Sequence, residues 1–340
     1  MDLRSCTKEE LMELAGEMGQ KPFRGRQLFE WVHKKRAGTI QEMTNLPARF
    51  REQLMEKHSL SAVTEVKRQV SGRGDTVKYL FSLSDGNQIE SVWMKYRHGN
   101  SVCISSQVGC RMACSFCAST LDGLSRNLTS GEMLSQIYEI QRATGERVSN
   151  VIVMGMGEPL DNYQNLIKFI RLLSDPDGTC ISQRNITVST CGLVDKIRDL
   201  MKEKLQITLA ISLHAPNDEI RKKIMPIANR YPLREIFEAC REYFLQTGRR
   251  ITFEYSLIRG VNDREEHAGE LARLCKGLNC HINLIPLNEV EERDCRCSLR
   301  EDIARFQKVL EKNGVNVTIR REMGSDIDAA CGQLRKKYNS

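Results

Sequence analysis

From about residue 101 onward, short apolar stretches alternate with amphipathic ones, and this rhythm constrains the fold more than any other feature of the chain. Strands are predicted at "SVCISSQ", "NVIVMGM", "NITVST", "QITLAISL", "ITFEYSLI", "HINLIPL" and "NVTIRR". Helical patterns such as "SGEMLSQIYEIQRAT" and "LREIFEACREYFLQTG" lie between most of them. Strands that alternate with helices indicate βαβ units and a parallel sheet. About six such units predict an α/β fold, an incomplete (β/α)6-type TIM barrel whose functional residues follow the carboxyl ends of the strands.

The residues before the barrel have two other patterns. Residues 1–60 predict a small helical domain, in which Thr7 and Glu10 form a capping-box pattern ahead of the first helix. Residues 61–97 predict a connecting β element, because "TVKYLFSL" and "NQIESVWMKY" flank an Asp85-Gly86 pair that is typical of a hairpin turn. We therefore expect a helical domain over 1–60, a β linker over 61–97 and a barrel over 98–340.

The composition indicates the cellular compartment of the chain and the use of its cysteines. No stretch approaches the roughly 18 apolar residues that a membrane helix needs, and the N-terminus lacks the apolar centre of a signal peptide. We therefore expect a cytoplasmic protein with no membrane contact. The chain has 13 cysteines, and an odd count without an export signal favours metal binding or thiol chemistry over a disulfide framework.

A basic segment lies in the predicted helical domain. Its cations are Lys21, Arg24, Arg26, Lys34, Lys35 and Arg36, and its one acid is Glu30. A solvated helix face explains the segment, and so does a surface that binds the phosphates of RNA or DNA. The net charge of +7 permits a polyanionic partner without requiring one.

Three cysteines lie within eight residues after the first repeating strand. Cys110, Cys114 and Cys117 have the spacing C-x3-C-x2-C. A structural zinc site needs a fourth ligand, usually from a second CxxC or a histidine pair, and the chain offers neither in the usual spacing. Thiolates also hold 4Fe-4S clusters, which normally take four ligands. Three thiolates leave one iron open to bind a small molecule, as a catalytic zinc keeps a vacant position; buried or zinc-binding cysteines are the alternative.

The triplet in this position resembles the radical S-adenosylmethionine (SAM) superfamily. Further stretches, "MGMGEPLDNY", "ITVSTCG", "ISLHAPND", "INLIPLN" and "GSDIDAACGQL", resemble the RlmN/Cfr family of RNA adenine methyltransferases over almost the whole chain. The branch that methylates C2 of an adenine in 23S rRNA and tRNA is the more similar one. The other branch methylates C8 of the rRNA adenine and confers antibiotic resistance, and residue chemistry alone does not separate the two. The resemblance implies a 4Fe-4S cluster with SAM on its open iron, a low-potential electron donor such as flavodoxin or ferredoxin, and a monomer.

The resemblance also implies roles for individual residues. Cofactor contacts are implied for residues that end or follow strands: Gly157, Glu158, Ser189, Ser212, Leu213, His214 and Asn288. Strand ends are where small molecules bind in this architecture, although an ordinary turn or a satisfied polar group would explain each residue alone. Cys331 matches a cysteine that carries a methyl group, Cys103 a resolving thiol and Glu90 a general base. Without the resemblance, both cysteines would be small buried residues and Glu90 a solvent-facing strand residue.

The implied reaction uses SAM twice. One SAM methylates Cys331, and a second one supplies the radical that activates this methyl group for attack on the adenine. Glu90 or another base removes the ring proton, and Cys103 releases the product through a transient disulfide with Cys331. Basic groups close to the thiols would promote the thiolate forms that this needs, and Arg320 and Arg321 are the candidates, although sequence does not show proximity. Two alternatives stay open: a nucleic-acid-binding protein with a structural cluster, and a radical SAM enzyme that acts on a small molecule or peptide.

Overall fold

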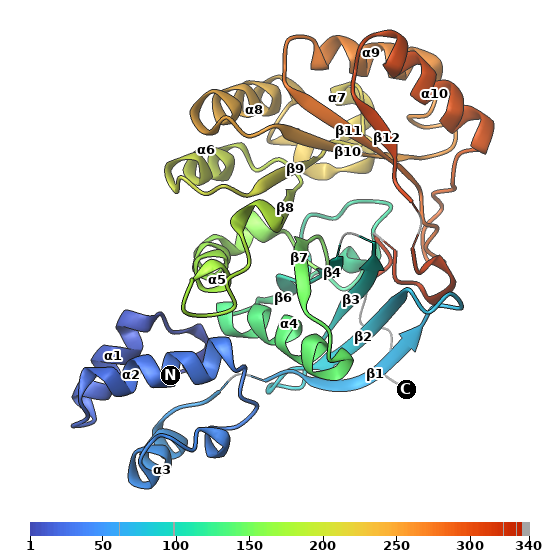
Figure 1. Cartoon of the computed structure of the whole chain (residues 1–340). Coiled ribbons are helices and arrows are strands. Elements are labelled where there is room, and N and C mark those ends of the chain that lie inside the picture. Colours follow the sequence, from blue (N-terminus) through green and yellow to red (C-terminus); the bar gives the residue numbers. More distant parts are fainter. Residues whose placement is uncertain (61, 98, 322, 331, 335–340) are drawn as a thin grey trace.

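The computed structural model describes residues 1–60, 62–97, 99–321, 323–330 and 332–334. In this part of the chain the main element is a ten-stranded curved sheet (Figure 1). In spatial order its strands are β1 (Thr64–Val70), β2 (Thr76–Ser82), β3 (Gln88–Tyr96), β4 (Gly99–Cys103), β7 (Val148–Val153), β8 (Ile186–Thr190), β9 (Thr208–Ser212), β10 (Ile251–Leu257), β11 (Cys280–Pro286) and β12 (Val317–Ile319). A separate two-stranded sheet joins β5 (Gln107–Gly109) to β6 (Leu124–Asn127).

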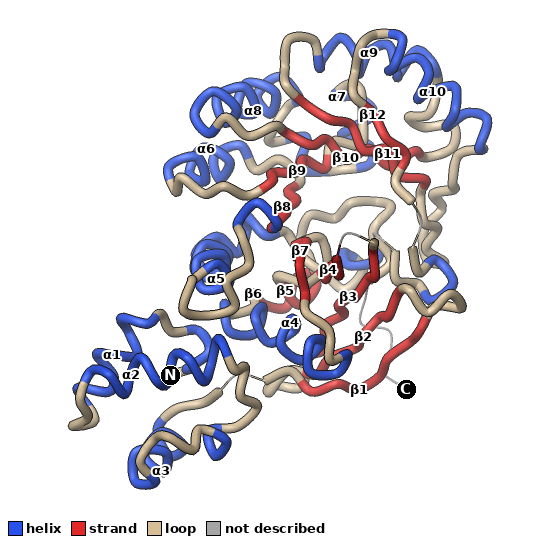
Figure 2. Tube along the Cα trace, in the orientation of Figure 1, coloured by secondary structure: helices blue, strands red, loops and turns tan. Residues whose placement is uncertain are grey.

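All neighbouring strands from β4 to β12 are parallel, whereas β1 to β4 are antiparallel. The helices that connect the parallel strands are α4 (Ser130–Thr144), α5 (Tyr163–Ser174), α6 (Val194–Lys202), α7 (Asp218–Ile224), α8 (Leu233–Thr247), α9 (Glu265–Cys275) and α10 (Arg300–Lys312). Figure 2 shows these helices on the outer side of the strands. Because β1 and β12 stand at opposite ends of the strand order, the sheet does not close, and the prediction of an incomplete barrel is confirmed.

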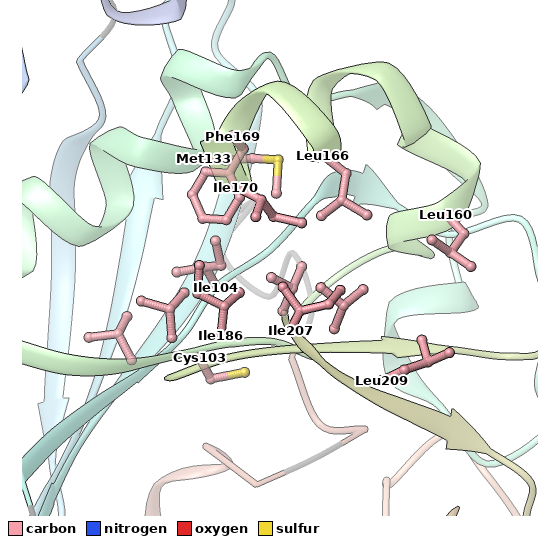
Figure 3. Close-up of a cluster of buried hydrophobic side chains, with 14 of the residues drawn as sticks. Cys103, Ile104, Met133, Leu160, Leu166, Phe169, Ile170, Ile186, Ile207 and Leu209 are labelled. Carbon is pink, nitrogen blue, oxygen red and sulfur yellow. The ribbon is translucent and has the colours of Figure 1, made fainter. Parts of the chain in front are cut away.

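The core lies between the parallel strands and the outer helices. Ile104, Ile186 and Ile207 are fully buried, and Figure 3 shows them on the side of the sheet that faces Met133 and Phe169. Complete burial of such side chains stabilises the fold by about 1.5–3 kcal/mol each. Successive residues of a strand point to opposite faces. Cys103, the neighbour of Ile104, accordingly lies on the other side of the sheet, which is the inside of the barrel (Figure 3).

The first 60 residues form helices, as predicted. They are α1 (Lys8–Glu17), α2 (Pro22–Phe29), a π-helical turn (Glu30–Lys34) and α3 (Ala48–Lys57). The expected capping box is present, since Thr7 and Glu10 each accept a backbone N–H from the other. This helical region packs directly on α4: the buried Arg4 donates to Ser135 Oγ at 2.8 Å. Short 3₁₀ helices occur elsewhere along the chain as well as in this region, at Leu3–Ser5, Ile40–Glu42, Ala118–Thr120, Pro159–Asn162, Gln183–Asn185, Pro226–Asn229 and Ser325–Ile327.

The predicted hairpin of residues 76–96 is confirmed as β2 and β3, with Ser82 opposite Gln88 beside the turn. An additional edge strand, β1, pairs with β2, and the sequence pattern does not predict it. None of the described helices is long and apolar enough to cross a lipid bilayer.

One prediction about the cysteine triplet is wrong in detail. The stretch "SVCISSQ" is not one strand: β4 ends at Cys103, and β5 begins at Gln107 in the separate small sheet. Between them the buried Ser105 turns the chain, because its hydroxyl donates to Glu90 O at 2.7 Å and accepts from Met156 N–H at 3.0 Å. The triplet therefore follows β5, not the first strand of the barrel.

Candidate functional site

The loop between β5 and β6 holds the three cysteines in a fixed backbone conformation. Cys110 N–H donates to Gly123 O at 2.9 Å. The Thr120 hydroxyl lies within hydrogen-bond distance of the carbonyls of Cys114 and Cys117, at 3.1 and 3.0 Å. Because these bonds join backbone and hydroxyl groups, they fix the loop without using the sulfur atoms of the three cysteines.

All three cysteines line one cavity at the carboxyl ends of the barrel strands. The cavity has about 970 Å³ of empty space, its open mouth included, which is within the range of small-molecule sites. The same cavity is lined by the expected cofactor contacts Gly157, Glu158, Ser189, Ser212, His214 and Asn288. The structure thus brings together residues from five separate parts of the sequence.

The triplet suits a cluster better than a single metal ion. Among the described residues, no three His, Cys, Asp or Glu side chains are placed to hold one ion. In a 4Fe-4S cluster each thiolate binds a different iron, so the three thiolates need not converge on one point. Burial raises the pKa of Cys110 to about 12, and burial together with the neighbouring thiolates of Cys117 and Cys110 raises the pKa of Cys114. Thiols that disfavour each other's ionisation need a neighbouring cation to become thiolates, and the irons of a bound cluster would supply it.

Gly157 and Glu158 form a tight turn after β7. Gly157 has φ +102°, and a Cβ at this position would lie 2.5 Å from Gln107 Cβ, so the turn requires glycine. The Glu158 carboxylate accepts the backbone N–H groups of Leu160 at 3.0 Å and Cys191 at 2.8 Å. Burial raises the pKa of Glu158. Hydrogen bonds from the side chains of Thr190 and Cys191 also lower the pKa of this carboxylate, against the effect of burial, so most of its acceptor sites are in use.

The ends of β8 and β9 contribute two hydroxyl groups, and His214 follows directly. Ser189 Oγ and Ser212 Oγ lie 3.1 Å apart. His214 Nδ1 accepts from Ser256 N–H at 2.9 Å, and burial lowers the pKa of the imidazole to about 3. The ring is therefore neutral near pH 7, and its proton is on Nε2. His214 also makes an edge contact with Phe116 in the cysteine loop, with 5.0 Å between the ring centroids.

Leu213 differs from the other expected cofactor contacts. Its side chain is fully buried in the core. The main chain of Leu213 is also occupied, because its N–H donates to Glu254 O at 3.0 Å and its carbonyl accepts from Arg221 Nε at 3.1 Å. Leu213 is thus fixed in the core, and it holds its neighbours Ser212 and His214 in position at the cavity.

A second cavity adjoins the first and contains Cys103. It has about 590 Å³ of empty space and is lined by Cys103 together with Val92, Met94 and Tyr96 of β3. The two cavities share the wall residues Met154, Ile285, Asn288, Arg320 and Leu334. Arg320 and Arg321 line the same cavity as Cys103. Ala329 and Ala330 line it too, whereas Cys331 itself lies outside the described residues.

Glu90 is not a solvent-facing residue. Only 1% of it is exposed, and its carboxylate lies 3.2 Å from Lys78 Nζ. Glu90 is on β3, two residues before Val92, so its side chain is on the same face of the sheet as the second cavity.

Sequence reasoning missed two charged residues of the site. Glu254 on β10 lines the first cavity, where burial raises its pKa and Arg320 lies 3.5 Å away. Its signal was a lone acid within the apolar strand "ITFEYSLI". Arg221 is fully buried and donates to the carbonyls of Cys191 at 2.6 Å and Leu213 at 3.1 Å. The sequence hint for Arg221 is its position three residues before Ile224, since residues three apart on a helix lie on the same face, here the buried face of α7.

The basic segment of the N-terminal helices is a solvent-accessible surface. Lys21, Arg26, Lys34 and Lys35 are exposed, and Arg24 and Arg36 are partly exposed. Lys35 Nζ lies 3.8 Å from the centroid of the Trp31 ring. The segment is therefore accessible to a polyanion as well as to water.

Comparisons with known proteins cover the whole chain. Residues 1–60 match the ribosomal RNA large subunit methyltransferase N-terminal domain, and residues 104–272 match the radical SAM superfamily. A probable dual-specificity RNA methyltransferase RlmN from Lachnoclostridium phytofermentans is 58% identical over 338 residues, which are 99% of this chain and 95% of the relative. A protein of the same description from Lachnospira eligens is 60% identical over 337 residues, 99% of this chain and 96% of the relative.

A solved structure agrees with these relatives. The crystal structure of a radical SAM methyltransferase from Sphaerobacter thermophilus has a TM-score of 0.95 and 44% identity, and the match covers 98% of this chain and 99% of that one. The radical SAM superfamily uses a 4Fe-4S cluster and SAM, which confirms the cofactors expected from the triplet. The chain is an enzyme, so the alternative of a purely binding protein is wrong. By its sequence and its structure, the chain belongs to the RlmN family of radical SAM RNA methyltransferases.

Proposed function

We propose that the enzyme methylates C2 of an adenine in two kinds of RNA: 23S rRNA, at the peptidyl-transferase adenine, and tRNA, next to the anticodon. The relatives' description as dual-specificity RNA methyltransferases supports two RNA substrates. The N-terminal match to an rRNA methyltransferase domain favours RNA over a small molecule or peptide. C2 rather than C8 follows the closer resemblance of the chain to the C2 branch.

The observation that carries this proposal is the shared wall of the two cavities. One cavity contains the cysteine triplet and the expected SAM contacts, and the other contains Cys103 and the residues just before Cys331. A methyl group that is loaded in the first cavity and delivered in the second has a short path between them. Asn288 and Arg320 stand at this boundary, because they line both cavities.

In the first cavity, Cys110, Cys114 and Cys117 would hold the cluster, and Glu158, Ser189 and Ser212 would bind SAM. When bound, this pair of cofactors supplies both the methyl group and the radical that activates it. Gly157 keeps the backbone close to the ligand because no side chain fits there. Neutral His214 can donate through Nε2 without adding a charge.

Cys331 accepts the methyl group and presents it to the adenine. Glu90 takes the proton from C2 after the methyl carbon has been attached, because the ring regains aromaticity only when that proton and the unpaired electron of the adduct both leave. This electron would pass to the iron–sulfur cluster. Cys103 then attacks the sulfur of Cys331: the S–S bond forms, the S–C bond breaks, and its electron pair stays on the methyl carbon, which takes up a proton. Arg320 and Arg321 favour the attacking thiolate.

The target adenine must leave its stack to enter this cavity, so unstacked loops of RNA are the expected substrates. The exposed cations of residues 21–36 bind the phosphates on either side of that loop. A low-potential electron donor such as flavodoxin or ferredoxin completes the system. We propose that the enzyme works as a monomer in the cytoplasm.

Nucleoside mass spectrometry tests the product. Total rRNA and tRNA are digested from cells without this chain, with it, and with its Cys331→Ala variant, and 2-methyladenosine and 8-methyladenosine are compared with standards. We expect 2-methyladenosine in both RNA classes, only where the unaltered chain is present. 8-Methyladenosine alone would transfer the enzyme to the C8 branch, and neither nucleoside would refute adenine as the substrate.

A further inference from the structure

Three ionisable side chains on the neighbouring strands β2, β3 and β4 share one face of the sheet. Val92 of β3 pairs with Lys78 of β2 on one side and with Cys103 of β4 on the other. Directly paired residues and residues two apart in a strand point to the same face. Lys78, Glu90 and Cys103 therefore share this face of the sheet. Cys103 lines the second cavity, whereas Lys78 and Glu90 lie next to Val92, which lines it, and of the three only Lys78 has no assigned role.

Lys78 is almost completely buried and has two partners. It is 5% exposed, and its Nζ lies 3.2 Å from Glu90 Oε1. The same Nζ donates to the carbonyl of Asp328 at 3.2 Å, across 250 positions of sequence. A lysine is almost never buried to this degree unless it is paired, because its ammonium must leave water. These two contacts are what holds it there.

The second partner belongs to the segment that leads to Cys331. Asp328 precedes Cys331 by three positions, and Ala329 and Ala330 between them line the second cavity. The turn between β1 and β2 also holds this segment near Ser325–Ile327, where Asp326 Oδ2 accepts Gly72 N–H at 2.8 Å. Of these two contacts, the one from Lys78 to Asp328 is the more buried, and Lys78 also contacts Glu90.

We propose that Lys78 is a positioning residue whose ammonium holds the Glu90 carboxylate and the Asp328 carbonyl together, so that the base and the methyl-carrying segment meet the adenine in one geometry. This inference rests on the roles given above to Glu90 and Cys331. An ammonium suits this task because it is a compact charge that also donates: it forms an ion pair with Glu90 and donates a hydrogen bond to the Asp328 carbonyl.

The test compares Lys78→Met, which keeps the length of the side chain without its charge, with Lys78→Arg, which keeps the charge. Lys95→Met is the matched control, because Lys95 is on β3 of the same hairpin but forms an exposed pair with Glu146. The first readout is hydrogen exchange of the amides of residues 324–330 in protein without RNA or SAM. The second readout is single-turnover formation of methyladenosine, with RNA-independent SAM cleavage measured in parallel.

We expect Lys78→Met to speed exchange in 324–330 and to slow product formation, each by about tenfold or more, as the loss of hydrogen bonds to a charged group predicts. SAM cleavage should change little, since Lys78 is not part of the wall of the first cavity. Lys78→Arg should recover most of both losses, and Lys95→Met should match the unaltered enzyme. Unchanged exchange and product formation in Lys78→Met would overturn the proposal.

Two further variants separate this inference from the proposed function. If Glu90→Gln forms product at the normal rate, the role of Glu90 as base is wrong, whatever Lys78 does. If Glu90→Gln fails while Lys78→Met behaves normally, only the positioning role is wrong. Should Lys78→Met not fold because Glu90 is left buried without its cation, the double variant Lys78→Met/Glu90→Gln replaces it. Faster exchange of 324–330 in the double variant than in Glu90→Gln supports the proposal, and equal exchange refutes it.

Discussion

Substitution of Gly157 by alanine tests the cofactor side of the site most directly. A Cβ at this position would lie 2.5 Å from Gln107 Cβ and 2.9 Å from Gln107 N, and the backbone has φ +102°. Gln107 has little freedom to move away. Its Nε2 donates to Asn127 and Asp161 at 2.8 and 3.0 Å, and its Oε1 accepts from Glu158 N–H at 2.8 Å.

The expected cost has two parts. A positive φ disfavours an L-residue by about 1–2 kcal/mol, and overpacking against a fixed neighbour adds about 1–3 kcal/mol. Gly157→Ala should therefore lower the free energy of unfolding by about 2–5 kcal/mol. Because relief of the clash moves Gln107 or Glu158, SAM should bind about 10- to 150-fold more weakly, as expected for loss of one hydrogen bond to a charged group.

Gly145→Ala is the matched control. Gly145 ends α4 with φ +67°, and a Cβ there meets nothing within 4 Å. This variant should show the backbone strain alone, about 1–2 kcal/mol, with normal SAM affinity. Denaturant unfolding of the two variants gives the stabilities, and anaerobic equilibrium binding of SAM to reconstituted enzyme gives the affinities. If Gly157→Ala unfolds and binds SAM as Gly145→Ala does, the close approach of this turn to Gln107 plays no part in the site.

Three further predictions concern the cluster, the resolving thiol and the RNA surface. Cys114→Ala should lose both the bound iron, about four per chain in the intact enzyme, and SAM cleavage; full iron content in this variant would contradict the ligand assignment. Cys103→Ala should accumulate RNA covalently attached through Cys331, visible on a denaturing gel with labelled RNA, and normal turnover without an adduct would remove the resolving role. Replacing Lys34, Lys35 and Arg36 by alanine should weaken RNA binding and reduce its salt dependence by up to roughly 0.7–0.9 log unit for each phosphate that the variant no longer neutralises, while RNA-independent SAM cleavage persists.

The barrel could be predicted because its signals are local. The stretch "SGEMLSQIYEIQRAT" coincides with α4, where Thr129 and Glu132 form a capping box and Gly145 ends the helix. Such caps and the 3.6-residue period are properties of neighbouring residues, so they are readable without a structure. The same holds for the β2–β3 hairpin, whose turn contains Gly86 with φ +80°.

The break between β4 and β5 could not be predicted, because its cause is not local. No glycine or proline interrupts "SVCISSQ", so the sequence gives no turn signal at the break. Ser105 leaves the strand because its partners come from elsewhere: its N–H donates to Gln136 Oε1 at 2.8 Å and its hydroxyl contacts Glu90 and Met156. A hydroxyl that bonds to other elements has the same appearance in a sequence as one that faces solvent.

Buried charges are the other part of the site that sequence patterns hide. Lysine and arginine are assigned to the surface because they are almost never fully buried unless paired, yet Lys78 is only 5% exposed and Arg221 is fully buried. Their partners explain why. Lys78 meets a carboxylate and a carbonyl beside the second cavity, whereas Arg221 meets the carbonyls of Cys191 and Leu213 at the ends of β8 and β9.

Both cations thus satisfy carbonyls that lie outside the regular hydrogen bonding of the sheet. Arg221 binds those of Cys191 and Leu213, directly after β8 and β9, and Lys78 binds that of Asp328, in the segment before Cys331. A buried carbonyl without a donor is costly, and an apolar replacement of either cation would leave such carbonyls without their donor. The two side chains therefore satisfy backbone carbonyls near the cavities, as hydrogen bonds between strands satisfy those within the sheet. The carbonyls that need these donors come together only in the folded chain. The periodicity of the sequence therefore predicts the fold of this enzyme but not the buried cations that support its cavities.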